Sequence, residues 1–322
     1  MMSIRSVVAG CGHYLPAKTL TNNDLSKIVD TNDEWISTRT GIRARHIVET
    51  ETTSDLAANA AKMALANAKI SAEDLDLVVL ATITPDYSTP ATALVVAEKV
   101  GVKSGVPAFD ISAACSGFVY ALTLADNMIK LGQVKNALVI GAETLSKVTD
   151  WTDRGTCVLF GDGAGAVVLQ AKETNDTIGI LSTKIFADCK HTTELRTSGG
   201  TSTTQSPGFI IMEGKEVFKY AVNALAEGAN KAIELANLTI NDIDWLIPHQ
   251  ANIRIIDGTA QRMGVDKSKV IVNIENVGNT SAASIPLALS QNIEQGKIQK
   301  GQTIVITAMG AGFTWGGAAI KI

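Results

Sequence analysis

The sequence AAKMALANAKISAEDLDLVVL, residues 60–80, returns in altered form as ANKAIELANLTINDIDWLIP, residues 229–248. Each stretch has apolar residues three or four apart, then a short polar turn, then an alternating Asp-apolar pair that enters an apolar run. The spacing of three to four residues predicts a helix, and the apolar run predicts a buried strand. Asp74 and Asp242 mark equivalent places 168 positions apart, so the chain contains a repeated unit of helix and strand.

A second block repeats at the same offset. Residues 109–125 read FDISAACSGFVYALTLA and residues 277–290 read VGNTSAASIPLALS, and each is a turn of small residues that opens an apolar helix. Two blocks in one register indicate a duplicated chain. We predict an N-terminal half of residues 1–173, which holds the candidate nucleophile Cys115, and a C-terminal half of residues 174–322, which holds His249 and Asn279.

Strands alternate with helices in both halves, which predicts an α/β protein with mostly parallel sheets covered on both faces. Two such halves packed face to face give five layers, αβαβα. The composition suits close layers, because apolar residues make up 46% of the chain and aromatic residues only 5%. The polar stretch SGGTSTTQSPG, residues 198–208, predicts either a flap near the active site or a plain exposed loop.

The net charge and the cysteine spacing indicate which kinds of partner and compartment suit the chain. The net charge of −4 provides no basic field for nucleic acid, so any anionic partner must meet a local basic patch. The four cysteines show no metal or disulfide spacing, which favours a reducing cytoplasm. The N-terminus lacks a signal-peptide run and no stretch of 18 apolar residues exists, so we predict no membrane partner.

Cys115 is the candidate nucleophile. It lies in DISAACSGF, after a strand expected to end near Ile111 and at the start of a helix expected from Ser116 to Lys130. Unpaired N–H groups at a helix N-terminus favour the thiolate and lower a cysteine pKa, so the spacing predicts a reactive thiol. The other cysteines are predicted to be structural: Cys11, Cys157 and Cys189.

His249 and Asn279 are the candidate partners of Cys115. His249 follows the repeated strand, where the first half has Ala81, and strand C-terminal ends are where α/β sheets place ligands. Asn279 lies in the turn equivalent to the cysteine turn. Alone, the histidine suggests a structural residue and Gly-Asn-Thr a turn with a helix cap. Because of the duplication, we expect all three side chains to meet in one cleft.

Two other patterns predict no site. The glycines at 161, 163 and 165 precede a β-like run rather than a helix, so close packing explains them better than nucleotide binding. The remaining histidines have no acids or cysteines at metal-ligand spacing, and no metal is expected. These histidines are His13, His46 and His191.

The motifs DISAACSGF, FGDGAGA, IPHQAN, VGNTSAAS and GAGFTWGGA carry a resemblance to a known family. The chain resembles, from end to end, β-ketoacyl-acyl carrier protein synthase III, a thiolase-like condensing enzyme. The resemblance implies the five-layer thiolase fold, a homodimer, and a catalytic triad of Cys115, His249 and Asn279. It also implies an acyltransferase that condenses an acyl-coenzyme A starter, expected to be acetyl-coenzyme A, with malonyl-acyl carrier protein. This step initiates type II fatty-acid synthesis and needs no cofactor beyond the coenzyme A thioester substrate.

The resemblance also implies roles for binding residues. The backbone N–H groups of Cys115 and Ala311 would hold the oxyanion, although the family usually has glycine at the second position. Trp35 and Arg154 would flank the coenzyme A adenine, with Arg39 near the phosphates. Asn252 would lie near the pantetheine end.

Two further sets follow from the same resemblance. Lys219, Arg254 and Arg262 match the basic patch that meets the acidic carrier protein, which would let an acidic enzyme bind an acidic partner. Thr89 matches the position beside the acyl pocket of the dimer mate. A smaller residue there leaves room for a longer or branched starter.

Three alternatives remain open. A sibling condensing enzyme with a different starter or acceptor would use the same triad, in secondary metabolism or in a hydroxymethylglutaryl-type reaction. A cysteine hydrolase would pair cysteine and histidine but leave the C-terminal motifs unexplained. A noncatalytic thiolase-like scaffold would have no need for the complete set of Cys115, His249 and Asn279.

Overall fold

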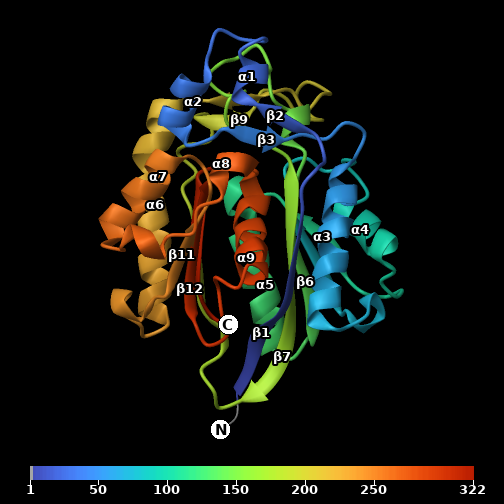
Figure 1. Cartoon of the computed structure of the whole chain (residues 1–322). Helices are drawn as coiled ribbons and strands as arrows, with labels where there is room; N and C mark the ends of the chain where they lie inside the picture. The colour runs from blue at the N-terminus through green and yellow to red at the C-terminus, as the bar shows by residue number, and fades with distance from the viewer. Residues whose placement is uncertain (1–2) are drawn as a thin grey trace.

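Two β-sheets form the centre of the computed structural model, which describes residues 3–322 (Figure 1). The first sheet has the order β1-β7-β6-β4-β5 and the second has the order β11-β12-β13-β8. The first sheet consists of β1 (Ser3–Tyr14), β7 (Gly163–Thr174), β6 (Asn136–Glu143), β4 (Leu77–Ala81) and β5 (Ala108–Ile111). The second consists of β11 (Trp245–Pro248), β12 (Thr303–Gly310), β13 (Thr314–Lys321) and β8 (Gly179–Ala187).

Helices cover both sheets and fill the space between them. Figure 1 shows α5 (Gly117–Lys130) and α9 (Ser284–Glu294) between the sheets, where both contact strands of each sheet. Helices α3 (Thr53–Ala68) and α4 (Thr92–Val100) cover the outer face of the first sheet. Helix α6 (Gly214–Leu235) covers the second sheet, and α7 (Ile253–Met263) packs beside it. The predicted αβαβα order of layers is confirmed.

Small residues explain how closely the layers approach. Helix α3 buries a face of alanines and is capped by Thr52, whose side chain forms a capping box with Asp55. A Cβ atom at Gly10 of β1 would lie 2.4 Å from the Ala64 backbone oxygen of α3. Only glycine permits this contact, so the abundance of Gly and Ala in the sequence reflects packing.

The prediction of mostly parallel sheets is wrong. Within residues 3–322, the two sheets contain three parallel pairings and four antiparallel ones. Strand β12 ends at Gly310 and β13 begins at Thr314, and so short a connection can only produce antiparallel neighbours. In each half the last strand, β7 or β13, runs antiparallel to both of its neighbours, at a place where helix and strand no longer alternate.

The repeat is visible in the strand order. Strands β1, β7, β6 and β4 occupy the same order as β8, β13, β12 and β11. The 3-10 turns η2 (Ala114–Ser116) and η6 (Ser281–Ala283) lie 167 positions apart, one fewer than the strands β4 and β11. The chain leaves the first sheet after Thr174 and enters the second at Gly179. The division of the chain near residue 173 stays a prediction.

Short elements complete the upper part of the molecule in Figure 1. They are β2 (Thr19–Thr21), α1 (Asn22–Leu25), α2 (Asp33–Thr40), β3 (Ala44–His46), β9 (Leu195–Thr197), β10 (Ile210–Met212) and α8 (Ile274–Val277). The polar stretch 198–208 connects β9 to β10 as an exposed loop. No helix formed by residues 3–322 is long and apolar enough to span a membrane.

Candidate active site

The structure brings Cys115, His249 and Asn279 into the wall of one cavity of about 900 Å³. Cys115 lies in turn η2, His249 directly follows β11, and Asn279 stands between α8 and η6. The first residue comes from the N-terminal half and the other two from the C-terminal half. The predicted convergence therefore depends on the packing of both halves.

Cys115 lies one turn before the helix proper. Helix α5 begins at Gly117, and Cys115 belongs to the preceding 3-10 turn, in which Ala114 has a φ of 46°. A Cβ atom at Gly310 would lie 2.6 Å from the Cys115 nitrogen, so the end of β12 must be glycine. The turn is thus held against the second sheet.

The expectation of a lowered Cys115 pKa is contradicted. Burial raises the pKa of the thiol to about 12, because removal from water penalises the thiolate. The nearby Ser281 hydroxyl lowers this pKa, and the charge of Glu143 raises it. Helix position alone therefore does not generate a thiolate in this site.

Glu143 is a buried carboxyl group that the sequence reasoning did not identify. It ends β6 and accepts hydrogen bonds from Thr84 Oγ1 at 2.6 Å, Thr82 Oγ1 at 3.2 Å and the Ile83 nitrogen at 3.1 Å. No ion pair within the described chain involves it. Burial raises the pKa of Glu143 to about 7. A single acid at the end of an apolar strand was its only sequence signal.

His249 is almost completely buried and uncharged at neutral pH. Burial lowers its pKa to about 3. The backbone nitrogen of His249 donates to the Thr307 oxygen at 2.8 Å, and Nδ1 lies 2.7 Å from Ser284 Oγ. When the Ser284 hydroxyl donates to Nδ1, the single imidazole proton must be on Nε2. This hydrogen bond would make His249 a donor at its other nitrogen.

Asn279 has a fixed orientation. Its Oδ1 accepts a hydrogen bond from the Ser281 nitrogen at 2.9 Å, and its backbone pairs with Leu159 and Gly161 of the first half. Because a backbone N–H can only donate, the side-chain atom facing it must be oxygen. The Nδ2 group therefore remains the donor for the cavity that Asn279 lines.

Ala311 lines the cavity beside Cys115, directly after Gly310. Two hydrogen bonds connect the start of β13, which follows Ala311, to the cysteine turn. Thr314 Oγ1 donates to the Ala113 oxygen at 3.1 Å, and Ser116 Oγ donates to Thr314 Oγ1 at 2.8 Å. The Cys115 and Ala311 nitrogens stay the predicted donors to the oxyanion. The contact between their two segments favours this role.

Two guanidinium groups contact the Trp35 ring. Arg39 stands 4.7 Å from the centre of this ring and Arg154 stands 4.8 Å from it. Arg154 also donates to the Asp30 oxygen at 2.8 Å. Because no ring fits between stacked groups at that distance, Arg154 has to leave Trp35 before the two can flank an adenine.

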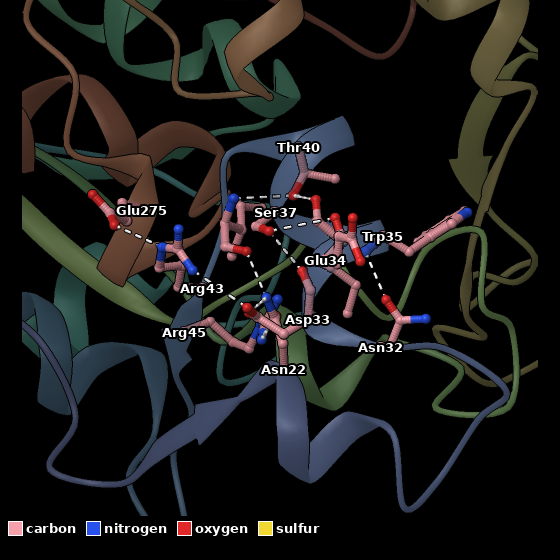
Figure 2. A network of polar contacts seen from close by, with 12 residues as sticks. Asn22, Asn32, Asp33, Glu34, Trp35, Ser37, Thr40, Arg43, Arg45 and Glu275 are labelled. Carbon is pink, nitrogen blue, oxygen red and sulfur yellow. Dashed lines mark hydrogen bonds and ion pairs between the residues drawn. The ribbon is translucent and has the colours of Figure 1, made fainter.

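Helix α2, which carries Trp35 and Arg39, is anchored by polar contacts (Figure 2). Asn32 Oδ1 caps the helix by accepting from the Trp35 nitrogen at 2.8 Å, and Asn22 donates to Asp33 at 2.8 Å. Arg43 joins Asp33 to Glu275 of α8. Figure 2 shows the Trp35 side chain directed away from these contacts.

The remaining predicted residues divide into two groups. Arg39, Asn252 and Arg254 line the cavity, whereas Lys219 and Arg262 lie exposed on α6 and α7 outside its wall. Thr89 is exposed on the connection between β4 and α4 and does not line the cavity of its own chain. Two basic residues that no motif marked, Arg196 and Lys215, do line it.

The excluded patterns have structural explanations. Gly165 approaches α9, where an added Cβ would lie 2.3 Å from the Leu287 nitrogen, so close packing against a helix requires it. Among residues 3–322, no group of three or more His, Cys, Asp or Glu side chains could hold a metal ion. The other histidines bond to protein groups: His13 to Ser290, His46 to Pro16 and His191 to Glu194.

A cavity with cysteine, histidine and asparagine between duplicated halves of an αβαβα fold defines a thiolase-like condensing enzyme. Models of 3-oxoacyl-[acyl-carrier-protein (ACP)] synthase III match residues 109–189 and, for the C-terminal part, residues 233–322. The chain belongs to the β-ketoacyl-[acyl-carrier-protein] synthase III family.

Relatives and solved structures agree with this assignment. β-Ketoacyl-[acyl-carrier-protein] synthase III of Rhodospirillum centenum is 55% identical over 99% of this chain and 100% of the relative. The crystal structure of the synthase III from Aquifex aeolicus VF5 is 49% identical with a TM-score of 0.93, covering 98% of this chain and 100% of that one. The priming β-ketosynthase of the R1128 polyketide pathway is 36% identical with a TM-score of 0.92, covering 99% and 97%.

Proposed function

We propose that the enzyme condenses an acyl-coenzyme A starter, expected to be acetyl-coenzyme A, with malonyl-acyl carrier protein. The products are 3-oxoacyl-acyl carrier protein, carbon dioxide and coenzyme A, and the reaction initiates type II fatty-acid synthesis. The convergence of Cys115, His249 and Asn279 on one cavity carries this proposal. Family membership over the full length supports it.

In the first half-reaction, Cys115 attacks the thioester carbonyl carbon of the starter. The new bond joins Sγ to the acyl carbon, the bond to the coenzyme A sulfur breaks, and the thiol proton leaves with coenzyme A. The adjacent Cys115 and Ala311 nitrogens are the proposed donors to the oxyanion. Because burial raises the thiol pKa to about 12, acylation depends on losing that proton as the substrate carbonyl is attacked.

In the second half-reaction, malonyl-acyl carrier protein loses carbon dioxide and leaves an enolate. His249 Nε2 and Asn279 Nδ2 are the proposed donors to its oxygen. Neutral His249 keeps one N–H at every pH above about 3, so it can donate without being charged. The enolate carbon then attacks the acyl carbon and displaces the Cys115 sulfur, which regains a proton.

The carrier protein is proposed to dock on the exposed basic residues Lys219, Arg254 and Arg262. The Arg254 guanidinium lies 5.3 Å from the Phe218 ring centre at the edge of the cavity, so it joins the surface to the site. Exposed charges act through steering that salt screens. Arg254→Glu should raise the KM for malonyl-acyl carrier protein while acylation by acetyl-coenzyme A changes little. Equal damage to both half-reactions would move the docking site elsewhere.

A homodimer is also proposed. Within residues 3–322, no strand pairs with the outer edge of β5, and Asp110 of β5 binds the nitrogens of Thr92 and Ala93 at the start of α4. Tyr87, 61% exposed, lies on the connection to α4, and Leu94, 47% exposed, lies on the helix. A second copy would cover this edge and place Thr89 beside its acyl pocket.

Light scattering at micromolar concentration tests the dimer, which a fully active monomer would disprove. Thr89→Phe should disfavour starters longer than acetyl, and an unchanged chain-length preference would remove Thr89 from the pocket. The cytoplasm stays the proposed location, because a free thiol nucleophile needs a reducing compartment.

One experiment tests the reaction itself. The enzyme is mixed with malonyl-acyl carrier protein and a panel of acyl-coenzyme A starters, and products are identified by mass spectrometry. The proposal expects 3-oxoacyl-acyl carrier protein with acetyl-coenzyme A as the preferred starter. Preference for another starter would favour a sibling condensing enzyme, which the 36% identity to a polyketide priming synthase keeps as the second candidate. Free acid alone would indicate a hydrolase.

A further inference from the structure

The charged residues that line the cavity are all of one sign. Arg39, Arg196, Lys215 and Arg254 contribute to its wall, and no Asp or Glu from residues 3–322 does. The whole chain has a net charge of −4, so this distribution opposes the average composition. A cavity lined by cations alone attracts anionic ligands.

Two of these cations already have partners. Arg39 stacks on Trp35 at 4.7 Å, and Arg254 stacks on Phe218 at 5.3 Å. Within residues 3–322, the other two cations, Arg196 and Lys215, do not stack on an aromatic ring. In the described part of the chain, neither Arg196 nor Lys215 forms an ion pair or a cation–π contact.

Local structure brings Arg196 and Lys215 to the same cavity. Arg196 is the middle residue of β9 and pairs with Ile211 of β10, while Lys215 is the second residue of α6, which follows β10. The Glu213 nitrogen donates to the Glu194 oxygen at 2.8 Å, which closes the hairpin onto the start of the helix. The only hydrogen bond from the Arg196 side chain within residues 3–322 is to the Thr197 oxygen at 3.1 Å.

Neighbouring acids do not neutralise the pair. Glu194 Oε1 lies 2.9 Å from His191 Nδ1, and Glu216 lies 3.8 Å from Lys219. Glu213 is exposed outside the cavity wall. Both cations are therefore free to bind an anion that enters the cavity.

We infer that Arg196 and Lys215 form a second phosphate-binding element, separate from the cluster of Trp35, Arg39 and Arg154, for the phosphate esters of pantetheine-bearing substrates. The planar guanidinium suits two parallel hydrogen bonds to phosphate, and the ammonium adds a mobile point charge. This inference rests on the proposed function, because both thioester substrates then carry such phosphates. Coenzyme A and the carrier-protein arm are the two sources that the experiment separates.

The test uses Arg196→Gln and Lys215→Gln, each of which removes the charge and keeps a polar side chain. Lys231→Gln is the matched control, because Lys231 lies on the same helix, is paired with Glu234 at 2.7 Å and does not line the cavity. Acylation is measured with acetyl-coenzyme A, its 3′-dephospho form, acetyl-phosphopantetheine and acetyl-pantetheine. Decarboxylation is measured with malonyl-acyl carrier protein and malonyl-pantetheine.

Each variant should raise the KM for the phosphate-bearing substrate about tenfold, the low end for a charge-assisted hydrogen bond, and leave kcat unchanged. The pantetheine thioesters, which have no phosphate, should react equally with variant and wild type. A loss that disappears with 3′-dephospho-acetyl-coenzyme A assigns the element to the 3′-phosphate of coenzyme A. A loss confined to malonyl-acyl carrier protein assigns it to the carrier arm.

Equal losses on phosphate-bearing and phosphate-free thioesters would overturn the inference, and so would variants that match Lys231→Gln on every substrate. Product analysis of the wild-type enzyme distinguishes a failure of this inference from a failure of the proposed function. If the wild-type enzyme makes 3-oxoacyl-acyl carrier protein, the function stands whatever these variants do.

Discussion

The turn that carries Cys115 and the turn that carries Asn279 share a backbone but differ in chemistry. In each, a 3-10 turn directly precedes a central helix: η2, which contains Cys115, precedes α5, and η6, which follows Asn279, precedes α9. Each contains a non-glycine residue with positive φ, Ala114 at 46° and Ser281 at 50°. Such backbone is uncommon outside glycine, so its presence in both turns reflects their common origin.

Each turn packs against a glycine in a strand of the other half. A Cβ atom at Gly310 would lie 2.6 Å from the Cys115 nitrogen, and one at Gly141 would lie 2.2 Å from the Ala282 oxygen. Cys115 and Ala282 are the central residues of their 3-10 turns, yet only the cysteine lines the cavity. The two turns have one backbone arrangement, but the nucleophile Cys115 lies in the first and the donor Asn279 in the second.

Moving the thiol between the turns should have the largest effect. Cys115→Ala should abolish acyl-enzyme formation, and the added change Ala282→Cys should not restore it, because Ala282 is buried outside the cavity wall. Intact-mass measurement after exposure to acetyl-coenzyme A checks both variants. Cys189→Ala, which changes an exposed cysteine, is the control. Acylation of the relocated thiol would show that the two turns are chemically interchangeable.

Removing either donor of the C-terminal half should damage only the second half-reaction. Asn279→Ala and His249→Ala should each lower decarboxylation about 10²- to 10³-fold, the typical cost of losing one such donor. Acylation should persist. Release of labelled carbon dioxide and the mass of the acyl-enzyme measure the two steps separately. If His249→Ala stops acylation as completely as Cys115→Ala, a Cys–His pair activates the thiol.

Adding a methyl group at Gly310 or Gly141 should destabilise the turn that packs against that glycine. Gly310→Ala and Gly141→Ala should each reduce the free energy of unfolding by about 1–3 kcal/mol, because the new methyl group meets backbone atoms that cannot move aside. Urea unfolding measures the loss. Gly200→Ala is the control, since its nearest atom would be at 3.5 Å. Unchanged stability in either variant would mean that the turn is not held by its strand.

Ser284, the first residue of α9, should set the tautomer of His249. Ser284→Ala should lower decarboxylation about tenfold, the cost of about one hydrogen bond, and Ser284→Thr should retain most of the rate. Nitrogen-15 NMR of His249 distinguishes this from a loss of packing, because the variant should lose the single Nε2–H form. An unchanged spectrum in Ser284→Ala would leave the tautomer to other contacts.

Replacing Glu143 should have the smallest effect, because the replacement changes only the charge near Cys115. An ionised Glu143 raises the Cys115 pKa, so Glu143→Gln should lower that pKa and increase the thiolate fraction. The pKa of Glu143 is about 7, so the difference should emerge as pH rises through 7 and vanish below it. Iodoacetamide alkylation should be about threefold faster in the variant at pH 8.5 and equal at pH 5.5. A difference that persists at pH 5.5 would indicate a structural effect instead.

Local patterns were enough to predict the elements of the repeat. The spacing of alanines and leucines predicted α3 with β4 and α6 with β11, because a helix or strand must show its own period to bury one face. Strand direction was beyond such patterns, since a pairing partner can lie anywhere in the chain. The predicted register of the two turns was also one residue off, because the turns lie 167 positions apart whereas β4 and β11 begin 168 apart.

The candidate site could be predicted for residues whose side chains suit catalysis and whose positions recur in the repeat. Cys115, His249 and Asn279 stand at the ends of predicted elements, and the duplication related their places to each other. Arg196 and Lys215 stand on different elements 19 positions apart in a polar region without a motif. Only the tertiary structure, in which β9 pairs with β10, brings both to one cavity.

The sequence by itself determined the duplication, the five layers and the residue types of the triad, because these depend on local periodicity and side-chain chemistry. The tertiary structure alone decided the charge states in the site. Burial raises the pKa of Cys115 and Glu143 and lowers that of His249, since desolvation depends on which distant segments pack around each group. A helix N-terminus is visible in sequence, but the removal of water that outweighs it is not.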